Sequence, residues 1–309
     1  MLLHLSSFMG QSNMLMVELD DHFVMGGSHL VCEDYTLTGT DGLRSWYVVC
    51  DGCSSSTKTD VGARVLAHVV GENISRIHGN CTDRQSVIVD CGRKALDILE
   101  TMGLGRWQLM CTLHIGIIDE DETLILSIGD GFDWVEFNDG SLFVATRAYK
   151  RNAPFYVGYL LNERDHAGYL AMEDENGVRN SGGKCVETHW RNGVQEHVIE
   201  HEDPTFIIEY AFPTKDVAKF GSATDGVDSF STPSKQYAAG HSIVPHLGSI
   251  ANPSRGFMKR RLNKMLIDLK KQDLTPFDDV GAATICVVYH EVPGAESGDS
   301  VPDGSELSC

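Results

Sequence analysis

Residues 45–56 read SWYVVCDGCSSS and change character in the middle. The first half, up to Cys50, is rich in aromatic and β-branched side chains, which is typical of a buried strand. The strand then runs into Asp51 and Gly52, and three serines follow at 54–56. An aspartate at this place either begins a turn or carries chemistry, in which case the small residues keep space open around it. The other motifs of the chain decide between these two interpretations.

The step from an apolar strand to Asp-Gly occurs three times, in YVVCDG, LSIGDG and FGSATDG. A single Asp-Gly pair is more often a turn than a ligand. Strand ends of one sheet lie close together at its rim, so several terminal acids can meet in one cleft. Two further acidic pairs stand in CEDY and at the start of the strand DDVGAATICVV. The acids selected by this pattern are Glu33, Asp34, Asp51, Asp130, Asp225, Asp278 and Asp279.

Clustered carboxylates repel one another, and a divalent cation removes that cost. Hard oxygen ligands without a matching set of histidines favour magnesium or manganese over zinc. A glycine after the acid lets the backbone approach an ion, and the carbonyl of Gly52 can itself be a ligand. The pattern therefore indicates a cation site at the strand ends, although it does not by itself identify an enzyme.

The composition limits the kinds of partner. The chain has 309 residues, 42% hydrophobic and 22% charged, which is ordinary for a globular protein. Its net charge of −19 repels a phosphate backbone, so we expect no nucleic-acid partner. No apolar run reaches the roughly 18 residues of a membrane span, and the start MLLHLSSFMG is too short for a secretory signal. Nine cysteines without framework spacing favour a reducing, cytoplasmic compartment.

The order of helices and strands predicts an α+β protein rather than an alternating βαβ one. Residues 14–25 indicate a hairpin with Asp20 and Asp21 near its turn, and the pair Asn192 and Gly193 favours another over 184–200. We expect a single domain over 1–292 and a disordered acidic tail over 293–309. Helices are predicted over 60–77, 83–99 and 256–272, and further strands over 46–50, 109–118, 123–129, 133–137, 206–212, 217–227 and 278–290.

The order of the motifs resembles the metal-dependent serine/threonine phosphatases of the protein phosphatase 2C type, over residues 26–289. GGSHLVCEDY is similar to the first acidic motif of that family, and VVCDGCSSSTKTDVGARVLA to its Asp-Gly motif with the following helix. CTLHIGIIDEDETLILSIGDG is similar to its strand pair that ends in Gly-Asp-Ser or Gly-Asp-Gly. SATDGV and DDVGAATICVV are similar to its last two acidic motifs. The form with SH, CED and a serine-rich loop resembles the bacterial branch more than the eukaryotic one.

The resemblance implies two packed antiparallel β-sheets flanked by helices, in four layers α-β-β-α. It also implies a phosphoprotein phosphatase that hydrolyses phosphoserine and phosphothreonine through two Mg²⁺ or Mn²⁺ ions and a metal-activated water, without a covalent phosphoenzyme. In the family the first acid of the final pair is a ligand and its neighbour is usually Asn, which leaves Asp279 outside the expected set. The implied metal residues are Asp51 bridging both ions, Gly52 through its carbonyl, Asp225 and Asp278 at the first ion, Glu33 and Asp34 through waters, and Asp130 with Asp225 at a weaker third ion.

Two positions depart from the family pattern. His29 stands where the family usually has a phosphate-binding arginine, which makes it the candidate contact to the substrate phosphate. Alternatively, His29 only packs beside the site, and the phosphate is held by another cation such as Arg44, Lys58 or Arg64. Cys53 stands where eukaryotic members have a histidine, so water or another residue would protonate the leaving group.

Other interpretations stay open at this point. Cys50 and Cys53 form a C-x-x-C, but a redox pair normally opens a helix, and a zinc site needs two more ligands. His197 and His201 would share one face of a strand, which a solvated hairpin explains without a metal. The main alternative is a phosphatase-like protein that binds partners without catalysis. Such a protein would typically lose a metal aspartate, and none is missing at the matched positions.

Overall fold

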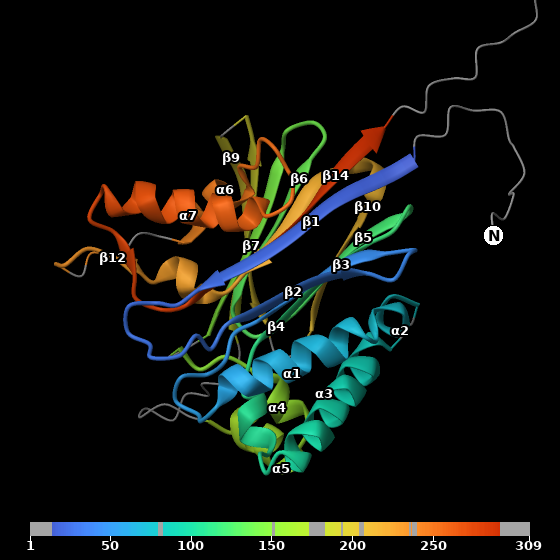
Figure 1. Ribbon diagram of the computed structural model, residues 1–309, viewed down its shortest axis with the longest axis vertical. Helices are drawn as coiled ribbons and strands as arrows, with labels where there is room; N and C mark the ends of the chain where they lie inside the picture. The colour runs from blue at the N-terminus through green and yellow to red at the C-terminus, as the bar shows by residue number, and fades with distance from the viewer. Residues whose placement is uncertain are drawn as a thin grey trace, which may run out of the picture.

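The chain folds into four layers, with two β-sheets packed between two layers of helices (Figure 1). The computed structural model describes residues 14–79, 83–149, 152–172, 183–192, 194–203, 207–234, 236 and 240–290. The predicted α+β sandwich of two antiparallel sheets flanked by helices is confirmed. The tail expected over 293–309 lies outside the described residues, and the domain boundary at 292 stays a prediction.

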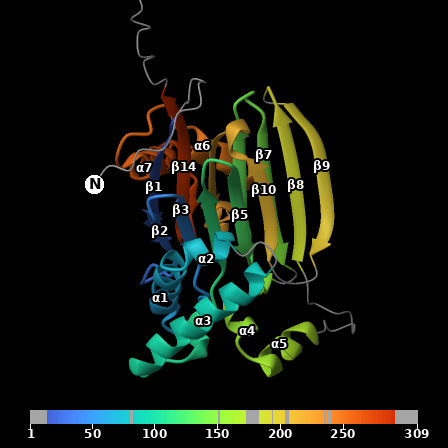
Figure 2. The same ribbon diagram turned by 90° about the vertical axis from the view of Figure 1, so that its right-hand side faces the viewer.

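Within the described residues, the larger sheet has seven strands in the order β1-β14-β11-β6-β7-β8-β9, and all neighbours are antiparallel. The predicted hairpin over 184–200 forms β8 and β9, which extend one edge of this sheet beyond β7 (Figure 2). The strands are β1 (Met14–Val24), β14 (Val280–His290), β11 (Val217–Ala223), β6 (Gly131–Phe137), β7 (Leu142–Tyr149), β8 (Gly183–Arg191) and β9 (Val194–Asp203).

The smaller sheet has five strands among the described residues, in the order β10-β5-β4-β3-β2, again antiparallel throughout. A separate short pair of strands, β12 (Phe230–Ser231) and β13 (Thr275–Pro276), joins two loops. The strands of the smaller sheet are β10 (Ile208–Pro213), β5 (Glu122–Ile128), β4 (Leu113–Ile118), β3 (Ser45–Cys50) and β2 (Tyr35–Thr40).

Amphipathic helices cover the outer faces of the sheets. α1 packs on β2 and β3 and against α3, whereas α6 and α7 cover the larger sheet (Figure 1). The predicted helix over 60–77 is divided after Gly71, and Asp83 caps α3 by accepting a hydrogen bond from the Ser86 N–H at 3.1 Å. The helices are α1 (Thr59–Gly71), α2 (Ile74–Gly79), α3 (Arg84–Thr101), α4 (Val157–Leu160), α5 (Glu163–Leu170), α6 (Gly240–Gly248) and α7 (Phe257–Lys270).

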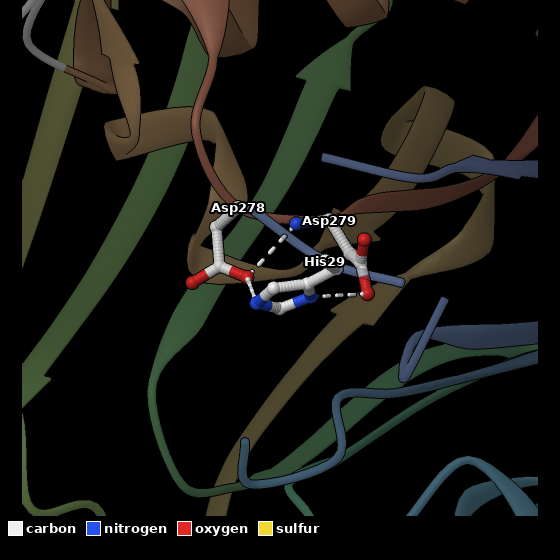
Figure 3. A group of neighbouring side chains, drawn as sticks. All are labelled: His29, Asp278 and Asp279. Atoms are coloured by element: carbon white, nitrogen blue, oxygen red, sulfur yellow. Dashed lines mark hydrogen bonds and ion pairs between the residues drawn. The ribbon is translucent and has the colours of Figure 1, made fainter. Parts of the chain in front are cut away.

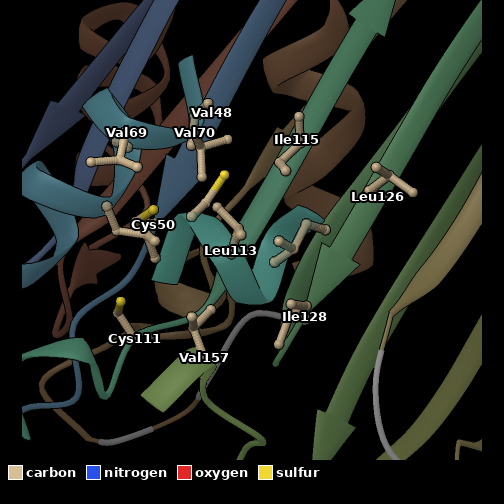
Figure 4. Packing of buried hydrophobic residues seen from close by; sticks show 14 of the residues in the cluster. Val48, Cys50, Val69, Val70, Cys111, Leu113, Ile115, Leu126, Ile128 and Val157 are labelled. Carbon is tan, nitrogen blue, oxygen red and sulfur yellow. The ribbon is translucent and has the colours of Figure 1, made fainter. Parts of the chain in front are cut away.

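The strand β3 is buried on both faces, which explains its nearly continuous apolar sequence. Val48 and Cys50 belong to the apolar cluster under α1 and α3 (Figure 4), whereas Tyr47 and Val49 belong to the cluster between the two sheets. Full burial of one such side chain contributes about 1.5–3 kcal/mol of favourable free energy. The apolar run that ends at Asp51 is therefore central to the fold.

The hairpin expected over 14–25 is wrong, because β1 is one continuous strand that pairs with β14 along its whole length. Asp20 and Asp21 lie in this strand and have partners outside it. Asp20 Oδ2 accepts from the Met258 N–H at the start of α7 (2.6 Å), and Asp21 accepts from the hydroxyls of Thr36 and Thr38 at 2.6 and 2.7 Å. Adjacent acids suggested a turn, but these partners let them remain within a strand.

The register brings the ends that carry the acidic motifs to one end of the sandwich. In the larger sheet, Ala223 at the end of β11 lies opposite Ala282 near the start of β14 and Phe132 near the start of β6. In the smaller sheet, Gly52 after β3 pairs with Cys111 just before β4. The expected convergence of the strand ends therefore occurs.

Candidate functional site

A cleft with a volume of about 220 Å³ opens at this end of the sandwich. Four of the acids selected from the sequence line it, although they lie far apart in the chain. None of the described lining residues is a lysine or an arginine. These lining residues are Asp51, Gly52, Cys53, Ser54, Ser55, Asp130, Asn152, Pro154, Tyr156, Asp225 and Asp278.

Asp51 directly follows β3 and is held by the neighbouring strand segment. Its N–H donates to Thr112 Oγ1 (3.1 Å), and its carbonyl accepts from the Thr112 N–H (2.8 Å). A Cβ on Gly52 would come within 2.8 Å of Thr59 Cβ and 3.0 Å of the Glu33 carbonyl oxygen. Glycine is therefore required by close packing at the floor of the cleft.

The other cleft acids come from three different connections. Asp130 lies in the turn between β5 and β6 and is 4% exposed. Asp225 opens the 3₁₀ turn Asp225–Asp228 directly after β11. Asp278 precedes β14, and its N–H donates to Ser229 Oγ at 3.0 Å. The Asp278 side chain keeps 39% exposure, so it lies on the open side of the cleft.

Asp34 is buried next to these acids and is only 1% exposed. Its Oδ2 accepts a hydrogen bond from Thr224 Oγ1 (2.8 Å). Its Oδ1 has no hydrogen-bond partner among the described residues. A buried, unpartnered carboxylate oxygen is costly, so it indicates a place where a water or a cation belongs.

Burial and mutual repulsion raise the pKa of the carboxyl groups in the cleft. For Asp51 the largest cause is burial, and the charges of Asp34 and Asp225 add to it. Burial, followed by the charge of Asp278, raises the pKa of Asp225 to about 6. The pKa values of Asp34, Asp130 and Asp278 are also raised, in each case chiefly by burial. A cation bound among these groups would remove the repulsion.

The residues of the cleft fit a hard divalent cation. Carboxylate oxygens from four segments converge on one space, and Asp34 Oδ1 offers a further oxygen without a partner. Such oxygen-rich sets suit Mg²⁺ and Mn²⁺. The close packing around Gly52 brings its backbone to the wall of the same space.

Asp279 lies beside the cleft but is fully engaged with the loop that precedes Asp34. Its Oδ1 accepts from the Gly26 N–H (2.7 Å), and its Oδ2 accepts from the Glu33 N–H (2.6 Å) and from His29 Nδ1 (2.9 Å). The side chain is 2% exposed. Asp279 thus ties the first acidic motif to the last one, a role that the sequence analysis missed because no local pattern reports it.

His29 lies between the two acids of the final pair, as Figure 3 shows. Besides its bond to Asp279, its Nε2 is 3.3 Å from Asp278 Oδ1 and 3.4 Å from Ser54 Oγ. Burial alone would lower the pKa of His29, but the hydrogen bond and charge of Asp279 outweigh this and raise it. His29 is therefore at the rim, where it contacts carboxylates and a cleft serine.

The other cations considered from the sequence do not line the cleft. Arg44 pairs with Asp41 (3.3 Å) in the connection between β2 and β3. This connection lies at the start of β3, whereas Asp51 and the cleft lie at its end. The Arg64 guanidinium lies over the Tyr35 ring, 5.0 Å from its centroid. Lys58 is exposed immediately before α1. Glu33, expected near the metal, accepts from Thr59 Oγ1 (3.1 Å) behind Gly52.

One wall of the cleft comes from a segment to which the sequence analysis gave no element. Asn152, Pro154 and Tyr156 precede α4 and face the acids. Burial raises the pKa of Tyr156, and the neighbouring Cys53 adds to this rise. No spacing or motif in this stretch predicts that it lies beside the strand ends.

The C-x-x-C is not a structural pair in the described residues. Cys50 is a buried member of the apolar cluster (Figure 4), whereas Cys53 is half-buried and lines the cleft, and both are free thiols. His197 lies on the exposed strand β9, as a solvated hairpin predicts. Neither observation supports a zinc site.

Comparisons with known proteins agree with the motif order. The family model for protein phosphatase 2C matches residues 26–267. The chain belongs to the protein phosphatase 2C family. The expected resemblance is thereby confirmed, and family membership supports a protein phosphatase. No curated protein matches the chain.

Solved bacterial phosphatases share the fold of this protein phosphatase 2C family member. The serine/threonine phosphatase Stp1 from Staphylococcus aureus is 10% identical with a TM-score of 0.52, and the match covers 92% of this chain and 100% of that one. The S. agalactiae serine/threonine phosphatase is 13% identical with a TM-score of 0.53, covering 88% and 100%. PppA from Pseudomonas aeruginosa is 15% identical with a TM-score of 0.51, covering 88% and 98%. At these identities the comparison shows the fold alone. Separately, none of the described helices is long and apolar enough to cross a membrane.

Proposed function

We propose that the chain is a phosphoprotein phosphatase that hydrolyses phosphoserine and phosphothreonine with two Mg²⁺ or Mn²⁺ ions in the acidic cleft. The observation that carries this proposal is the convergence of Asp51, Asp130, Asp225 and Asp278 on one space without a lining lysine or arginine among the described residues. A cluster of this kind is suited to cations and, through them, to an anionic substrate.

The residues of the cleft have distinct roles in this proposal. Asp51, with the carbonyl of Gly52, would contribute to holding both ions, and Asp225 and Asp278 would complete the first position. Asp130 with Asp225 would hold a weaker third ion. Glu33 and Asp34 act through waters, which agrees with the buried position of Asp34 behind the cleft.

When bound, the divalent cations supply a nucleophilic water at neutral pH and neutralise charge on the phosphoryl oxygens. The chain itself orients the substrate. Ser54 and Ser55 line the cleft, so their hydroxyl groups can donate to a phosphoryl oxygen. Tyr156 and Pro154 line the same cleft, so their rings can limit how the phosphoryl group turns. The seven cysteines in the part of the chain that the structure describes are free thiols, which agrees with the proposed cytoplasmic compartment.

The decisive experiment measures hydrolysis of p-nitrophenyl phosphate and of phosphoserine and phosphothreonine peptides with Mn²⁺, with Mg²⁺ and with chelator. We expect turnover of both substrate types only with added cation. Full activity in chelator, or a requirement for zinc, contradicts the proposal. A phosphatase-like binding protein gives no turnover with any divalent ion, although it retains a phosphoprotein on a column.

A further inference from the structure

A buried polar network lies between the two sheets, directly behind the cleft. His114 on β4 is 0% exposed and Asp133 on β6 is 2% exposed, with 2.9 Å between Nδ1 and Oδ1. Asp133 also accepts hydrogen bonds from Ser127 Oγ (2.7 Å) and Ser222 Oγ (2.6 Å). Ser222 in turn accepts from the Tyr47 hydroxyl (2.8 Å). The network thus joins strands of both sheets.

The second nitrogen of His114 points to the cleft. Its Nε2 lies 2.9 Å from the carbonyl oxygen of Asp130, and because a carbonyl only accepts, Nε2 carries a hydrogen. Nδ1 faces the Asp133 carboxylate on the other side of the ring, so Asp133 fixes the orientation of the imidazole. Burial alone would raise the pKa of Asp133, but the charge and hydrogen bond of His114 lower it.

The turn that carries Asp130 is fitted to this imidazole. Gly131 has a φ of +132°, and a Cβ there would come 2.7 Å from His114 Nε2. His114 is therefore one reason why a glycine follows Asp130, since a larger residue at position 131 would displace the ring from the Asp130 carbonyl.

Stability of the fold is a weak reason for this arrangement. A buried ion pair in an otherwise apolar layer is often no better than apolar residues of the same volume, because desolvation offsets the attraction. Many other side chains in the layer between the sheets, such as Phe220 and Ile285, are apolar, although Arg147 is also buried near Asp133. The pair of His114 and Asp133 is more simply explained by its contact with the turn that carries Asp130 at the edge of the cleft.

We propose that His114 is a positioning residue: oriented by Asp133, it holds the Asp130 carbonyl so that the Asp130 carboxylate faces the cleft and binds a cation there. This inference rests on the proposed function, since it gives Asp130 a metal role. It adds a residue that lies outside the acidic motifs and acts only through Asp130.

The test compares two double variants that differ only in reach. In H114Q/D133N, the longer amide can still donate to the Asp130 carbonyl, whereas in H114N/D133N the shorter amide cannot. A third variant, H114L/D133L, replaces the pair by apolar side chains and is expected to fold. T284V, at a buried threonine of β14 whose hydroxyl has no partner among the described residues, is the control for substitution in the sheet. Thermal unfolding monitors the fold of each variant.

Two readouts follow the turn and the cation separately. In metal-free protein, amide hydrogen exchange of residues 129–132 should be faster in H114N/D133N and H114L/D133L than in the parent, H114Q/D133N and T284V. In Mn²⁺ titration calorimetry, H114N/D133N and H114L/D133L should lose about tenfold or more in Mn²⁺ affinity at the weakest site. A loss of this size is typical when a residue supporting a ligand is removed. Equal exchange, or equal Mn²⁺ affinity, in H114N/D133N and H114Q/D133N overturns the inference while leaving the metal centre intact. A parent protein that takes up no Mn²⁺ overturns the proposed centre and this metal role with it.

Discussion

Asp130 and Asp133 are three residues apart, both are almost fully buried, and they have opposite electrostatic situations. Asp130 is 4% exposed, and its pKa is raised by burial and by the charge of Asp225. Asp133 is 2% exposed, and burial alone would raise its pKa, but the pKa is lowered by the charge and hydrogen bond of His114, the charge of Arg147 and the hydrogen bond from Ser127. Burial is common to both, so the partners decide the difference.

Asp133 is therefore a carboxylate that stabilises the fold, whereas Asp130 has the surroundings of a carboxylate that binds a ligand. Asp133 has its full set of hydrogen bonds within the chain, and so does Asp279 at the other side of the cleft. The pKa values of Asp130, Asp51 and Asp225 are raised by burial and by the charges of neighbouring acids instead, although Arg147 offsets part of the rise at Asp130.

D51N and D225N should each lower kcat/KM by about 100-fold or more, because cations contribute several kcal/mol to transition-state charge stabilisation and each 1.4 kcal/mol is tenfold. A neutral amide holds a hard cation less well, so Mn²⁺ binding should weaken in parallel. Turnover of p-nitrophenyl phosphate and calorimetry with Mn²⁺ measure the two effects. D139N is the matched control, because Asp139 is exposed and accepts a hydrogen bond from the Ser141 N–H. Its turnover and Mn²⁺ binding should equal those of the parent. Parent-like turnover in either cleft variant contradicts the ligand assignment.

D133N and D130N should have opposite effects on the stability of metal-free protein. D133N removes a buried carboxylate that is bonded to His114, Ser127 and Ser222, which should lower the free energy of unfolding by about 3 kcal/mol. D130N removes one of several repelling charges and should leave the free energy of unfolding unchanged or higher. Urea denaturation in chelator measures both variants under the same conditions. A similar loss in the free energy of unfolding of both variants would contradict the different roles given to Asp133 and Asp130.

Metal-free protein should become more stable as pH falls from neutrality toward about 5. Asp225 has a folded pKa of about 6 against an ordinary value of 3.8, so between these values the folded state binds more protons than the unfolded state. Stability then falls as pH rises through this window, and the melting temperature in chelator should be a few degrees higher at pH 5.5 than at pH 7.5. The raised pKa values of Asp34, Asp51 and Asp130 act in the same direction.

D225N isolates the contribution of one carboxyl group to this pH effect. Its melting temperature should be higher than that of the parent at pH 7.5, and the difference should shrink toward pH 5.5, where the parent group is protonated. Saturating Mn²⁺ should reverse the pH dependence of the parent, because cation binding requires ionised carboxylates. A parent that loses stability steadily from pH 7.5 to 5.5 in chelator rules out the repulsive cluster.

The sequence predicts the parts of the fold that depend on local pattern. The period of apolar residues locates α1, α3 and α7, and β3 is recognisable because both of its faces are buried. The hairpin over 14–25 was wrong because the partners of Asp20 and Asp21 come from α7 and β2, which no local pattern reports. Long-range hydrogen bonds overrode a turn preference there.

The residues of the candidate site also include some that a local sequence pattern predicts and some that it does not. Asp51, Asp130, Asp225 and Asp278 could be selected because each stands at a strand end, and the cleft brings them together. Tyr156 and Asn152 could not be selected, because their segment has no spacing that marks its position. The structural role of Asp279 was missed, although the residue itself was selected, because its partners are distant in sequence. His114 was missed because its role depends on a backbone carbonyl.

The smallest effect is expected at His29, and it distinguishes support of the loop from contact with the substrate. His29 Nδ1 provides one of three hydrogen bonds to Asp279, and the other two come from backbone N–H groups that no side-chain substitution removes. Loss of one such bond is worth about 0.5–1.5 kcal/mol, so H29A should lower kcat/KM by roughly 2- to 13-fold. H29N can still donate to Asp279 and should recover most of the loss. If His29 instead contacts the phosphate, H29A raises KM with kcat unchanged, H29N does not help, and H29R lowers KM for phosphopeptide because a guanidinium grips two oxygens. Steady-state kinetics of the three variants on one phosphoserine peptide therefore decide between the two roles. The geometry, with both ring nitrogens directed at carboxylates, favours support of the loop.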